Sequence, residues 1–178
     1  MRSRTTNWFE IGVKYEKTLE DGRQGKVSEQ YVVDALSFTE AETSIVEELS
    51  AYISGEFTIA KIAKATYGEV FFSDKETDDN FFKVKLNFIT IDEKTEKEKR
   101  TLVTYLVQAH SLPQAVTYIQ DVMSNTMIDY VISAIQETKI MDVFEHNAAK
   151  STPKAEVNDV PEYEANDKAE QDASNKPE

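Results

Sequence analysis

Aromatic rings and lysines share one face of two segments whose alternating pattern predicts strands. That face carries Trp8, Glu10, Gly12 and Lys14 in the first segment and Phe81, Lys83, Lys85 and Asn87 in the second. Proteins hold single-stranded nucleic acid with this combination, because bases stack on the rings, for about 1–3 kcal/mol each, while lysines follow the phosphates. The pattern predicts a binding surface for single-stranded DNA made of Trp8, Lys14, Phe81, Lys83 and Lys85.

The same rings have a second explanation. Trp8 and Phe81 would show this pattern equally if they packed against the other half of the molecule or against a partner subunit. The chain would then be a protein–protein interaction or virion assembly module that binds no nucleic acid. Its partner subunit can be a second copy of the same chain, which would make it a homo-oligomer. A net charge of −13 favours this alternative, because an acidic body repels a phosphate backbone.

Residues 147–178 differ in composition from the rest of the chain. They contain three prolines and four lysines against eight acidic residues, with almost no apolar periodicity. Such a segment buries too little apolar surface to offset the entropy of ordering, so we expect a disordered acidic tail. Within it, apolar residues stand among acids, as in the tails with which single-strand binding proteins recruit partners: Asp159, Val160, Pro161, Glu162 and Tyr163. This stretch is predicted to bind replication or assembly proteins, although acidic tails also serve as simple solubilisers.

The sequence lacks the residues of the common catalytic and metal sites. There is no cysteine, which excludes disulfides and thiolate ligands and fits a cytoplasmic protein. His110 and His146 are not spaced as a pair of metal ligands, and there is neither a Gly-rich phosphate loop nor a nucleophile elbow. No stretch approaches the roughly 20 apolar residues that span a bilayer. We therefore expect no enzyme activity, no cofactor, no metal and no membrane partner.

An internal repeat must position these residues. A shift of about 73 residues aligns residues 7–9 (Asn-Trp-Phe) with residues 80–82 (Asn-Phe-Phe). Further matches follow in the same order through every predicted element, among them Tyr31 with Tyr105, Ser37 with Ser111, Ile45 with Ile119 and Val70 with Val143. The sequence therefore predicts one duplicated domain, residues 1–146, with copies at residues 7–72 and 80–144.

Each copy is predicted to be a ββαβ unit. Two strands joined by a polar hairpin come first, followed by a helix whose start is marked by a capping-box serine, Ser37 or Ser111. A long closing strand ends each copy, at residues 57–72 and 128–144. The predicted fold class is α+β: a mostly antiparallel sheet, or two sheets related by pseudo-symmetry, with both helices packed on one side.

The closing strands contain the same irregularity. Their alternation slips by one residue between Ile59 and Ile62 in the first copy and between Ile132 and Ile135 in the second. A slip of one residue in a strand is typical of a β-bulge. The sequence predicts a bulge in both copies.

Several segments of the body are similar to a known family: residues 8–10, 33–41, 53–57, 83–90 and 140–144. Residues 7–145 resemble a domain-of-unknown-function family of Bacteroides-type gut bacteria and their phages. The resemblance implies no established activity, but it implies a phage or mobile-element setting, where DNA replication and virion assembly are common roles. Together these observations predict a non-catalytic single-stranded DNA-binding or replication accessory protein, with the interaction or assembly module as the alternative.

Overall fold

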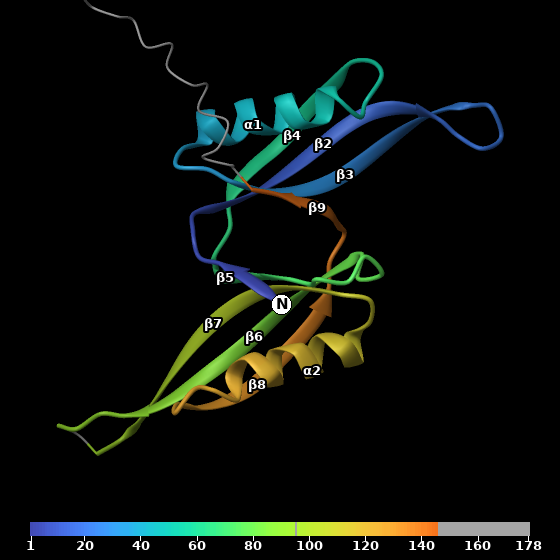
Figure 1. Cartoon of the computed structure of the whole chain (residues 1–178). Coiled ribbons are helices and arrows are strands. Elements are labelled where there is room, and N and C mark those ends of the chain that lie inside the picture. Colours follow the sequence, from blue (N-terminus) through green and yellow to red (C-terminus); the bar gives the residue numbers. More distant parts are fainter. Residues whose placement is uncertain (95, 146–178) are drawn as a thin grey trace, which may run out of the picture. The chain divides into compact units, whose positions relative to one another are not determined.

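Two β-sheets and two helices make up the part of the chain that the computed structural model describes, residues 1–94 and 96–145 (Figure 1). The elements are, in order, β1 (Arg2–Arg4), β2 (Trp8–Thr18), β3 (Gln24–Asp34), α1 (Phe38–Ser50), β4 (Phe57–Lys64), β5 (Tyr67–Phe72), β6 (Asn80–Ile91), β7 (Glu98–Ala109), α2 (Leu112–Met123), β8 (Asp129–Glu137) and β9 (Ile140–Phe144). This arrangement confirms the predicted α+β class. In both copies, two strands, a helix and two further strands follow one another.

The last strand of each copy crosses into the sheet of the other copy. The first sheet has the order β4-β2-β3-β9, and the second sheet has the order β1-β5-β7-β6-β8. β5 pairs in parallel with β7, and β9 pairs in parallel with β3, whereas the other strand pairs of the described residues are antiparallel. Each predicted closing strand is therefore divided in two, at residues 65–66 and 138–139, since the chain leaves one sheet there and enters the other.

The predicted bulges are present in both copies. Where β4 pairs with β2, the register skips Ala60, and where β8 pairs with β6, it skips Ser133. The two extra residues lie at equivalent positions of the repeat, so the bulge belongs to the repeated fold and not to one copy.

The helix starts follow the predicted capping boxes in part. Ser37 Oγ accepts a hydrogen bond from the N–H of Glu40 at 3.2 Å, and the Glu40 carboxylate accepts one from the N–H of Leu36 at 2.7 Å. At the start of α2, Gln114 accepts the equivalent bond from the N–H of His110 at 3.1 Å, but the cap serine makes no side-chain bond. The second helix thus has one of the two hydrogen bonds of a capping box.

Each helix covers the outer face of its own sheet (Figure 1). The outward residues of the central strands pack under the helices: Phe9, Ile11 and Val13 of β2 under α1, and Phe82, Val84 and Leu86 of β6 under α2. The inward residues of both sheets form a central core that includes Trp8, Val32, Val70, Phe72, Phe81, Leu106, Ile140 and Val143. The helices therefore do not share one side as predicted, because the inner faces are themselves apolar and bury each other.

Candidate interaction surface

Trp8 and Phe81 occupy equivalent places in the central core. Trp8 is 0% exposed and Phe81 is 3% exposed, and the Trp8 ring lies 6.4 Å from the Phe72 ring. Neither ring presents a face on which a base can stack. The exposed stacking platform predicted for these two residues is therefore wrong, and the alternative, packing against the other copy, describes their position. Alternation could not separate the two cases, because it does not reveal what covers a face.

Lys83 makes a charged contact between the two copies. Its Nζ lies 3.1 Å from Oε1 of Glu10, the residue that precedes it by one repeat, and 5.1 Å from the ring centre of Tyr67. Tyr67 also donates a hydrogen bond to Glu10. Burial would raise the pKa of Glu10, but the hydrogen bonds from Tyr67 and Lys83 and the charges of Lys83 and Lys61 lower it below its usual value. Lys83 thus neutralises a carboxylate of the other copy.

Reversing the charge of Lys83 is expected to destabilise the protein. In Lys83→Glu two carboxylates face each other, and because both positions are partly solvated we expect the unfolding free energy to fall by only about 1–2 kcal/mol. The double reversal Glu10→Lys/Lys83→Glu restores an opposite pair and should recover more than half of the loss. Urea unfolding of the wild type, both single variants and the double variant measures the coupling. Strictly additive effects would show that the two charges do not interact.

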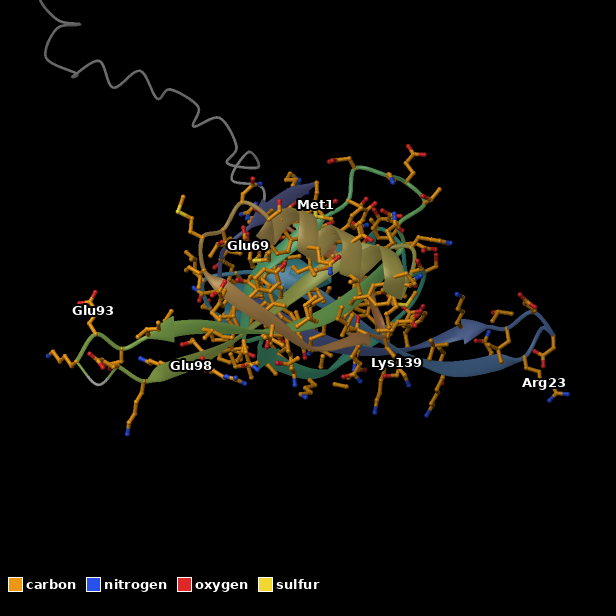
Figure 2. The ribbon with its side chains drawn as sticks, turned by 90° about the horizontal axis from the view of Figure 1, so that it is seen from below. Met1, Arg23, Glu69, Glu93, Glu98 and Lys139 are labelled. Atoms are coloured by element: carbon orange, nitrogen blue, oxygen red, sulfur yellow. The ribbon has the colours of Figure 1, made fainter. Side chains whose placement is uncertain are left out.

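Lys14 and Lys85 are exposed and lie on different sheets. Lys14 lines an open hollow of about 930 Å³ near the β2–β3 hairpin, together with Lys26, Glu16 and Glu56. Two acids balance two lysines there, which weakens any attraction for phosphate. The β2–β3 hairpin, marked by Arg23, and the β6–β7 hairpin, marked by Glu93, extend in opposite directions (Figure 2). The structure therefore does not bring the five predicted DNA-binding residues together on one surface.

Large apolar side chains are exposed on the inner face of the second sheet, beyond the central core. There Asn87 of β6 lies between Leu102 of β7 and Val131 of β8, and Ile89 and Ile91 follow on the same face of β6. Ile91 is 71% exposed, Leu102 57% and Val131 48%. We call these three residues, together with the partly buried Ile89, the distal patch.

The equivalent positions of the first copy are polar. In the same register, Lys14 lies between Ser28 and Thr58, and Glu16 and Thr18 stand where the second copy has isoleucines. Since the two sheets are built from equivalent strands, the fold itself does not require apolar residues at these positions. Sequence reasoning missed this surface, although comparing the two copies position by position would have found it.

One family model matches most of the chain. It describes a domain of unknown function (DUF4494) and matches residues 7–146. The chain belongs to this family. The DUF4494 match spans both copies, so the family domain comprises the duplicated unit together with its exchanged strands. No curated protein and no solved structure matches the chain.

Among residues 1–94 and 96–145, no group of three or more histidine, cysteine or acidic side chains is placed to hold a metal ion. Within the same ranges, no helix is both long and apolar enough to cross a membrane. The tail residues predicted to bind partners lie outside the described residues: Asp159, Val160, Pro161, Glu162 and Tyr163.

A buried carboxylate holds the loop before β6 of the DUF4494 domain. Asp78 is 2% exposed and accepts hydrogen bonds from the Ser73 hydroxyl, from the Tyr118 hydroxyl at 2.8 Å and from the Gln114 amide at 3.4 Å. Gln108 donates to its backbone carbonyl at 2.8 Å. Burial would raise the pKa of Asp78, but the hydrogen bonds from Ser73 and Tyr118 lower it below its usual value. Asp78 thus ties the end of β5 to β7 and α2.

Proposed function

We propose that this chain is a non-catalytic protein–protein interaction module and that the distal patch is its binding surface. The observation that carries the proposal is a difference between the two copies: at equivalent positions of the two sheets, the second copy has apolar side chains and the first copy has polar ones. Removing apolar surface from water contributes about 25 cal/mol per Å², and exposed apolar side chains with polar neighbours, here Asn87, Arg100 and Asp129, mark binding sites. A bound protein surface would gain this contribution at the second copy and not at the first.

Single-stranded DNA binding is the second candidate function and has less support. Lys14 and Lys85 remain exposed and able to contact phosphates. However, the two rings that were to stack bases are buried in the central core, and Lys83 is paired with Glu10. Without stacking, lysines on an acidic protein offer only weak, salt-sensitive attraction.

The proposed setting is a phage or mobile element of Bacteroides-type gut bacteria, with the protein in the host cytoplasm. The resemblance of residues 7–145 supports this setting, in which assembly of virions requires non-catalytic proteins that bind one another. The acidic tail would provide a second contact, through residues 159–163, to replication or assembly proteins.

Giving two residues of the distal patch their first-copy counterparts is expected to weaken binding of an apolar dye. In Leu102→Ser/Val131→Thr we expect the fluorescence of bound anilinonaphthalene sulfonate to fall several-fold, because the dye loses its apolar surface. The unfolding free energy should change by less than about 1 kcal/mol, since both side chains are about half exposed. The reciprocal variant, Ser28→Leu/Thr58→Val, should gain a dye site on the first sheet. Dye titrations of the three proteins, with circular dichroism to check folding, make the comparison.

Two results would contradict this proposal. Equal dye fluorescence in the wild type and in Leu102→Ser/Val131→Thr would show that the distal patch is not a binding surface. Binding of oligo-dT at low salt that disappears in Lys14→Ala/Lys85→Ala would favour the DNA-binding function instead.

A further inference from the structure

The outer edges of β4 and β8 are unpaired in the described part of the two sheets. β4 stands at one end of the first sheet, and β8 stands at one end of the second. An unpaired edge presents backbone N–H and C=O groups that can continue the sheet into another molecule. The opposite edges, β9 and β1, are only five and three residues long, and short edge strands resist such pairing. β4 and β8, with eight and nine residues, are the longer edges.

These two long edges carry opposite charges. β4 contains Lys61 and Lys64 and no acidic residue, whereas β8 contains Asp129 and Glu137 and no basic residue. All four side chains are exposed. Two β4 edges therefore repel each other, as do two β8 edges, but β4 of one molecule attracts β8 of another.

We infer that molecules of this chain associate head to tail, with β4 of one molecule pairing with β8 of the next. The inference rests on the proposed interaction function and identifies the partner as a second copy. Val131 belongs both to β8 and to the distal patch, so an incoming β4 borders the patch. Because the two edges are different surfaces, the contact is heterologous and builds rings or open chains instead of closed dimers.

The contact is expected to be weak. The bulges at Ala60 and Ser133 interrupt both edges, and a bulge limits how many consecutive residues can pair with a new strand. The charges that select the partner are exposed and therefore screened by salt. Association should thus depend on protein concentration and weaken as salt is added.

Sedimentation velocity of the full chain at low salt tests the inference, against a monomer mass of 20.3 kDa. The wild type is expected to form species larger than a dimer as its concentration rises. Lys61→Glu/Lys64→Glu makes both edges acidic, and Asp129→Lys/Glu137→Lys makes both edges basic, so each variant alone should associate at least about tenfold more weakly. An equimolar mixture of the two variants should associate again, because each acidic edge then meets a basic one.

A matched control separates edge pairing from a general effect of charge. Lys17→Glu/Lys26→Glu makes the same change in net charge as Lys61→Glu/Lys64→Glu, but on the β2–β3 hairpin, and should associate like the wild type. Circular dichroism confirms that every variant is folded.

Three outcomes would overturn the inference, and the dye experiment then decides whether the proposed function stands. Association that persists in both edge variants, or a mixture that fails to associate, would exclude pairing between β4 and β8. A wild type that remains at 20.3 kDa at every concentration would also exclude it. If that monomeric protein still loses dye binding in Leu102→Ser/Val131→Thr, the proposed function stands and the partner is a different protein; if dye binding is unchanged as well, both are wrong.

Discussion

Replacing Trp8 with alanine is expected to lower the free energy of unfolding by about 3–5 kcal/mol, the usual range for removing a large aromatic side chain from a core. Trp8 is 0% exposed and lies in the core that joins the two sheets, so the cavity opens at the contact between the copies. Native proteins are stable by only about 5–15 kcal/mol, and this one substitution therefore removes a large part of the total. Urea unfolding followed by far-ultraviolet circular dichroism measures the loss without needing tryptophan fluorescence.

Trp8→Phe is the matched control, because the second copy itself has phenylalanine at the equivalent position, Phe81. The Trp8 indole N–H is buried and has no hydrogen-bond partner among the described residues. Leaving such a donor unsatisfied costs about 1–3 kcal/mol, and phenylalanine removes it while keeping most of the ring. We expect Trp8→Phe to cost less than half as much as Trp8→Ala. A loss below about 1 kcal/mol in Trp8→Ala would show that this side chain does not hold the sheets together.

Removing the Asp78 carboxylate is expected to cost about 2–4 kcal/mol of stability, because three partly buried donors lose their acceptor. In Asp78→Ala the Ser73 and Tyr118 hydroxyls and the Gln114 amide, which all point to this side chain, lose a shared partner. Asp78→Asn keeps the shape and one acceptor oxygen, so we expect it to recover about half of the loss. Thermal and urea unfolding of the three proteins at neutral pH make this comparison.

The contribution of Asp78 should also depend on pH. Its pKa is lower in the folded protein than in the unfolded chain, so the unfolded chain takes up the proton first as the pH falls. The stabilisation is therefore fully present above the unfolded pKa, near pH 4, and is lost as the pH falls through the lower folded value. The difference in stability between wild type and Asp78→Asn should shrink below about pH 4. A difference that stays constant from pH 7 to pH 2 would contradict the assigned role.

The repeated local features were predictable because they depend on residues close in sequence. The serine and glutamate at 37 and 40 mark a helix start whatever surrounds it, and the slip between Ile59 and Ile62 marks a bulge within one strand. The exchange of β5 and β9 between the sheets was not predictable in this way. Only two residues separate β4 from β5, and nothing in them distinguishes an irregular strand from a strand that changes sheets.

The candidate site was harder to predict because it depends on what covers each face. Trp8 and Lys83 lie on equivalent faces of two strands with alternating sequence patterns, β2 and β6. This pattern suggested an exposed basic surface with aromatic rings. In the structure a second sheet covers the ring, and Glu10, one repeat earlier in the chain, neutralises the lysine. The distal patch was missed for the opposite reason, since Leu102 and Val131 look like ordinary core residues of their strands. In the sequence, only the polar residues at the equivalent positions of the other copy, Ser28 and Thr58, indicate that Leu102 and Val131 are not core residues.

During synthesis on the ribosome, the first copy cannot complete its own sheet. β3 ends at Asp34, but its outer neighbour β9 begins only at Ile140, near the end of the domain. β5 likewise lacks its parallel neighbour β7 until residues 98–109 have been synthesised. Until those strands emerge, the inward side chains of β2 and β3, among them Trp8 and Val32, have no sheet to cover them, and nascent chains with such exposed surfaces are prone to associate wrongly. The emergence of residues 140–144 therefore completes the first sheet, and neither half is expected to fold alone as a fragment.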